Sequence, residues 1–479
     1  MRQLVAVLAL GLGSAVPQGS IDDVIDAEMA ASGAPGMAYA VVSDGEVTEV
    51  GARGVVRAGG DTAVTPDTPF MSGSITKSVT ALAVMQLVEA GDVALDAPVS
   101  DYLEPFSAGP GAAITVEQLL SHTSGFSTMQ GNSSFADGEG GADELARRVE
   151  GLATTAPAHA PGETWEYSNA NYLVLGRLVE VVSGLDYQAY VRTHVLDPIG
   201  MTDSFVSDGE VHESMATGHT PWFLGKRALP ENTTSRGMAP AGGVVASARD
   251  LARFLAVMMD GEDDVLSADG KAQMMRPAGP GSPYYGFGWF VDPGNGTVWH
   301  SGSTPGVETL ATMVPSQGAG VVVLVNAGSG VGFGETAQLR DAVTAQALGL
   351  DYEGEGSRLP QQALFLGLVL LPVVYLLSIV WAWRHRARIR AKRRGGAAGL
   401  FSLWFPLLTT LVAAWVVLVL VPGLMGAPIA TISLFQPDLG LAMVATAVCG
   451  VLWAVVRLGV AYTGGAGARP EGIDQPAGA

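Results

Sequence analysis

Cysteine and lysine are both scarce in this sequence. The single cysteine, Cys449, stands in an apolar run near the C-terminus, so an intrachain disulfide is excluded and no catalytic thiol lies in the rest of the chain. Lysine occurs only as Lys77, Lys226, Lys271 and Lys392, and the formal net charge is −20. An acidic chain with so few lysines is not expected to bind nucleic acid.

Two motifs of hydrolytic enzymes are missing as well. None of the 7 histidines stands in an H-E-x-x-H stretch, which argues against a zinc peptidase. No serine stands in G-x-S-x-G, the nucleophile elbow of α/β-hydrolases. We expect neither a metal ion nor another cofactor.

Charge is absent from three long apolar runs near the C-terminus. They cover about residues 364–383, 400–421 and 439–460, and the only charged side chain among them is Arg457, near the end of the third. Each run is long enough to cross a bilayer as a helix. The sequence therefore predicts a membrane region over residues 363–462 with three spans, rather than three buried core helices.

A strongly basic loop between the first two runs sets the predicted orientation. Residues 384–394 carry seven arginines and lysines and no acid. Such loops stay in the cytoplasm, and they can also contact anionic lipid headgroups. The part before the first span should then lie outside the cytoplasm, and residues 463–479 should form a cytoplasmic tail. We expect a multi-pass protein of the cell membrane, with membrane lipid as a partner.

An exported N-terminal part needs an export signal. Residues 1–19 supply Arg2, an apolar run from Leu4 to about Leu12, and the small residues Gly13 and Ala15. This pattern predicts a signal peptide, or alternatively an uncleaved N-terminal anchor, and both give the same topology for the rest of the chain.

Residues 20–350 are predicted to form one domain, whose first third has clear local signals. The apolar spacing of residues 21–33 predicts a helix that stops at a glycine. Asp44-Gly45 between two β-prone runs predicts a hairpin. A second helix is expected from Thr76 to about Ala90, with an apolar stripe along one side.

The remainder of the domain combines helices with late strands. Residues 93–254 are mostly helical in pattern, with a glycine-rich surface loop at 130–141 that contains the sequon of Asn132, a glycan acceptor in a host with the machinery. Strands joined by short turns return after residue 296 and a helix follows, before a polar linker at 351–362. We predict an α+β fold: an antiparallel sheet flanked by helices, with a mostly helical second lobe.

Lys77 follows Ser74 by three residues in the stretch SITK, at the predicted start of a helix. Residues three apart share a helical face, so the amine can reach the hydroxyl. Serine needs a base to take its proton, and a buried lysine can be neutral and act as that base. The free N–H of Ser74 can also face a developing oxyanion. Taken alone, SITK is explained as well by a surface helix with a solvated lysine.

Two further stretches carry suitable polar groups. In GETWEYSNANY, Tyr167 and Asn169 stand two apart just before a predicted helix, where a phenol can serve as base or proton relay and an amide can bind the lysine and a substrate. In VWHSGSTPG, His300 and Gly302 lie at the end of a strand, and the N–H of Ser303 can be a second oxyanion donor.

The order of these three motifs resembles that of the serine β-lactamase and penicillin-binding protein superfamily, most closely its class C β-lactamase-related branch. There, S-x-x-K is followed by Y-x-N and then by [KH]-[ST]-G. Neighbouring stretches such as ITVEQLLSHTSGF, PGETWEYSNANYLVLGRLVE and YGFGWF also resemble this branch. The resemblance covers about residues 21–350 and not the membrane region.

The resemblance implies roles for the catalytic residues. Ser74 would be the nucleophile that becomes acylated, and Lys77 its activating amine. Tyr167 would be a general base toward the serine and an acid toward the leaving group. The reaction would then be hydrolysis through an acyl-enzyme, without a metal.

The resemblance also implies a set of substrate-binding residues. Asn169 would position the substrate, His300 and Gly302 would form the third motif, and the N–H of Ser303 would join that of Ser74 in the oxyanion hole. His122 in LSHTSGF is expected to be a structural turn histidine.

His300 departs from the β-lactamases of this branch, which carry a lysine there to recognise the substrate carboxylate. A largely neutral histidine argues against efficient β-lactam hydrolysis. It leaves esters, amides and D-amino-acid or peptidoglycan-like peptides as substrates, as for the esterases, D-aminopeptidases and D-alanyl-D-alanine carboxypeptidases of the branch. The alternative hypothesis is a non-catalytic penicillin-binding-like protein that keeps the fold as an envelope sensor or recognition protein.

Overall fold

The structure is a computed structural model that describes residues 20–133, 135, 140–352, 354 and 356–463. The predicted signal peptide, and all of the predicted tail except Thr463, lie outside the described residues. The chain divides into two compact units. The first combines Met1–Ala363 with Pro422–Gly440, and the second combines Leu364–Val421 with Leu441–Ala479.

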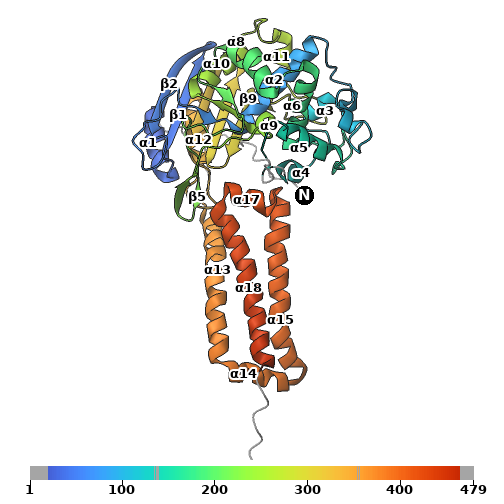
Figure 1. Cartoon of the computed structure of the whole chain (residues 1–479). Coiled ribbons are helices and arrows are strands. Elements are labelled where there is room, and N and C mark those ends of the chain that lie inside the picture. Colours follow the sequence, from blue (N-terminus) through green and yellow to red (C-terminus); the bar gives the residue numbers. More distant parts are fainter. Residues whose placement is uncertain (1–19, 134, 136–139, 353, 355, 464–479) are drawn as a thin grey trace, which may run out of the picture. The chain divides into compact units, whose positions relative to one another are not determined.

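A six-stranded antiparallel sheet in the order β2-β1-β11-β10-β9-β8 forms the centre of the first unit (Figure 1). Asp44 and Gly45 join β1 to β2 with φ of 53° and 77°, the left-handed values that a tight hairpin turn requires. The predicted hairpin is therefore confirmed. The strands are β1 (Gly36–Ser43), β2 (Glu46–Gly54), β8 (Phe290–Asp292), β9 (Thr297–Thr304), β10 (Val307–Val314) and β11 (Ala319–Val325).

Alternate residues of β1 pack against different helices. Met37 and Tyr39 lie in one buried cluster with residues of α1 and α12. Ala38 and Ala40 lie in the larger cluster with residues of α10 and of the helical lobe. This period of two is what a sheet covered on both faces requires, and the predicted α+β sheet flanked by helices is confirmed. The helices are α1 (Ile21–Ser32), α10 (Ala248–Met259) and α12 (Ala337–Leu348).

The second lobe is mostly helical, as predicted. Its elements are α3 (Val116–Leu120), α4 (Thr128–Ser133), α5 (Glu144–Ala153), α6 (Asn169–Ser183), α7 (Tyr187–Val191), α8 (Asp197–Ile199), α9 (Ala239–Gly242) and α11 (Ala268–Met274). Two small sheets were not predicted, because their strands have only two to four residues: β3 (Phe70–Met71), β4 (Phe205–Val206) and β7 (Val244–Ala246), and the pair β5 (His219–Trp222) and β6 (Gly225–Ala228).

Two local predictions about this lobe need correction. The predicted helix after SITK exists as α2 (Thr76–Glu89), but it has no exposed polar side, because every residue from Thr76 to Met85 is buried. The expected surface loop at 130–141 begins instead as the last part of α4, where Gly131 is buried. A Cβ atom at Gly131 would lie 2.5 Å from the backbone nitrogen of Asn169, so α4 packs tightly on the start of α6.

Within the residues that the structure describes, three helices are long and apolar enough to cross a membrane, which agrees with the predicted spans. They cover Leu359–Arg384, Gly396–Met425 and Pro437–Tyr462, with mean hydropathies of 2.7, 2.4 and 2.3. The first, α13 (Leu359–Arg384), begins inside the residues expected to be linker. The second comprises α15 (Gly396–Trp415), a π-helical turn and α16 (Val421–Met425), and the third is α18 (Pro437–Tyr462). The short helices α14 (Arg386–Ala391) and α17 (Ile429–Phe435) lie in the two connections.

Candidate active site

Two glycines bring the first and third motifs together. Ser74 lies in the 3₁₀ turn Gly73–Ile75, directly before α2. Gly73 has φ 57°, and a Cβ atom there would lie 2.7 Å from the backbone nitrogen of Ser303. A Cβ atom at Gly302 would lie 2.0 Å from the carbonyl oxygen of Ser72. Side chains at either position would therefore push β9 away from the serine turn.

Lys77 is fully buried and contacts the serine turn, Asn169 of the second motif and helix α9. Its Nζ lies 3.0 Å from Ser74 Oγ, 2.7 Å from Asn169 Oδ1 and 2.7 Å from the carbonyl oxygen of Ala241 in α9. These partners are a hydroxyl, an amide and a peptide carbonyl, and none is a carboxylate. Burial lowers the pKa of Lys77 well below its ordinary value, because none of these three partners carries a negative charge to compensate the lost hydration.

The three partners of Lys77 match the hydrogen-bonding capacity of a neutral amine. A neutral amine has two N–H groups and one lone pair. Asn169 Oδ1 and the Ala241 carbonyl accept the two N–H groups. In the neutral form the lone pair faces Ser74 Oγ, so the serine hydroxyl can donate its proton to Lys77, whereas in the ammonium form Lys77 donates its third N–H to Ser74 Oγ.

Tyr167 and Asn169 enter the site at the start of α6. Ser168 occupies the N-cap position of this helix without a side-chain cap hydrogen bond, and Tyr167 immediately precedes it. The centre of the Tyr167 ring lies 4.9 Å from Lys77 Nζ. Burial raises the pKa of Tyr167, and a hydrogen bond with Ser74 offsets only part of that rise. The phenol therefore keeps its proton at neutral pH.

His300 is buried and neutral. Its Nε2 lies 3.1 Å from the Tyr285 hydroxyl, and its Nδ1 lies 2.7 Å from the carbonyl oxygen of Ser301. Because the Ser301 carbonyl can only accept, Nδ1 carries the proton and Nε2 accepts from Tyr285. Burial is the main cause that lowers the pKa of His300 to about 3, with a smaller contribution from the protonated form of Lys77. Without a charge, His300 cannot replace the lysine that binds a substrate carboxylate.

Several neighbours of the site were assigned no catalytic or binding role from the sequence. His122 has φ 61°, and its Nδ1 accepts hydrogen bonds from the Ser168 backbone N–H and the Asn171 amide, which fits the structural turn histidine expected there. Tyr285 is fully buried yet supports His300. No local pattern marks the Ala241 carbonyl, because any residue type supplies one.

No candidate metal site accompanies these residues. Within the described part of the chain, no three histidine, cysteine, aspartate or glutamate side chains lie close enough to hold an ion.

The fold and the placement of S-x-x-K define a class of protein: an antiparallel sheet covered by helices, with the motif serine at the start of a buried helix under a helical lobe. The chain belongs to the Beta-lactamase family, whose model matches residues 21–346. The resemblance inferred from the motifs is thus confirmed, and the match ends before the first apolar helix.

Individual relatives agree with this family assignment. The chain is 32% identical to penicillin-binding protein 4 of Amycolatopsis lactamdurans over 322 residues, which is 62% of this chain and 82% of the relative. Its fold is similar to an octameric penicillin-binding protein homologue from Pyrococcus abyssi, with a TM-score of 0.60 and 28% identity over 69% of this chain and 77% of the other. A D-amino acid amidase from Ochrobactrum anthropi SV3 has a TM-score of 0.57 and 26% identity, over 69% and 96%. The family thus includes hydrolases that act on small molecules.

Proposed function

We propose that this chain is a membrane-anchored serine hydrolase that works outside the cytoplasm through an acyl-enzyme on Ser74. One observation carries the proposal: the amine of Lys77 is buried, without a counter-charge from any described residue, 3.0 Å from the serine hydroxyl. A neutral amine in that position is the base that a serine nucleophile needs.

In the acylation step, the Ser74 hydroxyl gives its proton to Lys77 while Oγ bonds to the acyl carbon of the substrate. The carbonyl oxygen becomes an oxyanion, which the N–H groups of Ser74 and Ser303 would stabilise. The bond to the leaving group then breaks, and the leaving group takes the Tyr167 proton, which the Lys77 ammonium replaces. Water repeats the sequence on the acyl-enzyme, releasing the acid and restoring Ser74.

Burial determines which of the two residues, Lys77 or Tyr167, acts as the base. The resemblance implied that Tyr167 takes the serine proton. Its raised pKa instead favours the protonated phenol, while the lowered pKa of Lys77 favours the free amine. We therefore assign the base to Lys77 and the proton relay to Tyr167.

The neutral His300 bears on the substrate class. Esters, amides and D-amino-acid peptides need no cation at this position, whereas a β-lactam carboxylate would find none. The similarity to a D-amino acid amidase and to penicillin-binding proteins supports this substrate range. We propose that β-lactams acylate Ser74 slowly compared with uncharged acyl donors.

The extracytoplasmic location has support from the connection between the second and third spans. Pro422–Gly440 belongs to the same compact unit as the hydrolase domain, so both lie on one side of the membrane. The basic loop 384–394 is separated from that connection by one span and would lie on the other side. Seven cations favour the cytoplasm for this loop, which leaves the domain outside.

Active-site labelling tests the proposal. The full chain and Ser74→Ala are treated with a fluorophosphonate and with a fluorescent penicillin, and adducts are located by peptide mass spectrometry. We expect a Ser74 adduct with the fluorophosphonate and a slower one with the penicillin. If neither probe labels Ser74, the non-catalytic sensor is the better hypothesis.

A further inference from the structure

The connection between the second and third spans packs on the helix beside the active site. We call Pro422–Gly440, which belongs to the first unit, the interspan segment. The Gly426 carbonyl oxygen accepts a hydrogen bond from Asn132 Nδ2 at 2.9 Å. The hydroxyl of Thr431 donates to the Asn132 carbonyl oxygen at 2.9 Å. The rings of Phe135 and Phe435 meet edge to face with centroids 5.4 Å apart.

Asn132 continues this contact into the active site. Its Oδ1 accepts from Asn169 Nδ2 at 2.9 Å, and Asn169 Oδ1 accepts from Lys77 Nζ at 2.7 Å. Three hydrogen bonds therefore join the interspan segment to the catalytic amine. Asn169 is nearly inaccessible to solvent, so water cannot easily replace its partners.

The Gly426 carbonyl group fixes which atom donates and which accepts in each of these hydrogen bonds. A peptide carbonyl can only accept, so the Gly426 oxygen requires the NH₂ group of Asn132. The Asn132 oxygen then faces Asn169 and requires its NH₂ group. That leaves the Asn169 oxygen toward Lys77, where it accepts an N–H. Turning either amide around would set two donors or two acceptors against each other.

We propose that Asn132 is a positioning residue through which the interspan segment holds the Asn169 amide in its productive orientation at Lys77. Displacement of the segment would release Asn132 and let the Asn169 amide rotate. The reactivity of Ser74 would thus depend on a part of the chain tied covalently to two membrane spans. The activity readout of this proposal rests on the proposed hydrolase function.

Two glycines of the segment provide a matched pair of variants. Gly426 has φ 65°, and a Cβ atom there would lie 2.9 Å from Thr128 Cγ2. Gly426→Ala should therefore lift the segment off α4. Gly423 has nothing within 4 Å of its Cβ position, so Gly423→Ala is the control. Asn132→Ala removes the connecting amide itself.

The first experiment measures the rate constant of Ser74 labelling by a fluorophosphonate against pH, on the full chain in detergent micelles. Gly426→Ala and Asn132→Ala should each lower the plateau rate about tenfold, as expected for loss of one hydrogen bond. The acid limb of each rate–pH profile should move to lower pH, because the Lys77 ammonium loses the Asn169 acceptor.

The double variant should be no slower than Asn132→Ala, and Gly423→Ala should match the wild type. A misfolded fraction would reduce the amplitude without moving the limb. Unchanged labelling in Gly426→Ala would overturn the proposal.

The second experiment does not need activity. Hydrogen exchange of peptides that cover residues 127–133 and 166–172 is compared among wild type, Gly423→Ala and Gly426→Ala. Faster exchange in both peptides of Gly426→Ala alone supports the link, and unchanged exchange overturns it. If the wild type shows no Ser74 adduct, the proposed function fails, while this measurement still decides whether the segment acts on the site.

Discussion

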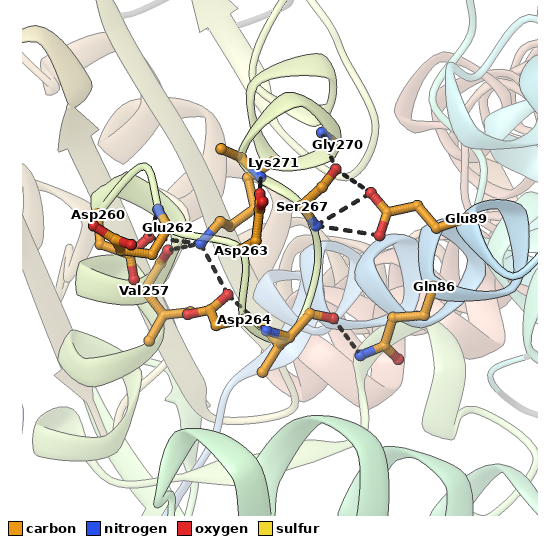
Figure 2. Close-up of polar contacts among 12 residues, drawn as sticks. Gln86, Glu89, Val257, Asp260, Glu262, Asp263, Asp264, Ser267, Gly270 and Lys271 are labelled. Atoms are coloured by element: carbon orange, nitrogen blue, oxygen red, sulfur yellow. Dashed lines mark hydrogen bonds and ion pairs between the residues drawn. The ribbon is translucent and has the colours of Figure 1, made fainter.

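Two buried lysines of this chain differ in what surrounds them. Lys77 is inaccessible, and its hydrogen-bond partners in the described part of the chain are all neutral. Lys271 in α11 is 1% exposed, but its Nζ lies 2.6 Å from Asp260 and 2.9 Å from Asp264, whose carboxylates are about a third exposed. Figure 2 shows both carboxylates accepting hydrogen bonds from the Lys271 amine.

The surroundings distinguish a lysine whose charge is compensated from the lysine proposed as the base. The two carboxylates compensate the charge of Lys271. This lysine joins the turn at Asp264, before α11, to the end of α10, where it also donates to the Val257 carbonyl. The same turn holds the far end of α2, since the Ser267 N–H donates to Glu89 (Figure 2). Lys77, in the first turn of that helix, has no such carboxylate partner among the described residues. A charge that nothing compensates is unstable in a buried site, so the amine is driven to the neutral, basic form.

The largest effect is expected for Lys77→Met, which removes the amine but keeps the length of the side chain. Loss of the general base should lower the rate constant of Ser74 labelling about 1000-fold. The free energy of unfolding should change less than in Lys271→Met, because no carboxylate loses its partner. Labelling kinetics and thermal unfolding of the full chain in detergent check both parts. A rate within tenfold of the wild type would show that Lys77 is not the base.

Lys271→Met should give the reverse pattern. Two partly buried carboxylates would remain close together without a cation, which we expect to cost about 3 kcal/mol of unfolding free energy. The labelling rate constant of the folded protein should stay within about twofold, since the site is untouched. Adding Asp260→Asn and Asp264→Asn should restore part of the stability. An unaltered unfolding transition in Lys271→Met would contradict the structural role.

His300→Lys tests the effect of adding a cation to the site. The fluorescent penicillin carries a carboxylate and the fluorophosphonate does not. The ratio of their labelling rates should rise about tenfold, the value of one charge-assisted hydrogen bond. His300→Gln is the neutral control and should leave the ratio unchanged. Equal changes with both probes would mean that the position does not meet the carboxylate.

Much of the fold could be predicted because the residues that specify these elements are close together in the chain. The Asp44-Gly45 turn, the helix that begins at Thr76 and the three apolar helices all follow from residues that are close in the chain. The complete burial of Thr76–Met85 in α2 could not be predicted in this way, because it depends on the packing of α6, α9 and α11 around that helix.

The candidate site, too, could be predicted in part from local sequence, while the rest depends on contacts between distant segments. The sequence supplied the motif residues and their order. It could not show that Lys77 meets no carboxylate, since this depends on atoms from α6 and α9. Asn132 was expected only to be a surface glycan acceptor, because its partners Asn169 and Gly426 are distant in sequence.

Direct titration of Lys77 tests the central claim. With only four lysines in the chain, labelling with ¹³Cε-lysine gives a simple NMR spectrum, and Lys77→Met assigns the signal of interest. We expect the Lys77 signal to titrate well below the ordinary pKa of 10.5, so that the amine is available as a base. Titration at or above 10.5 would mean that Lys77 is a cation at neutral pH and cannot take the proton of Ser74.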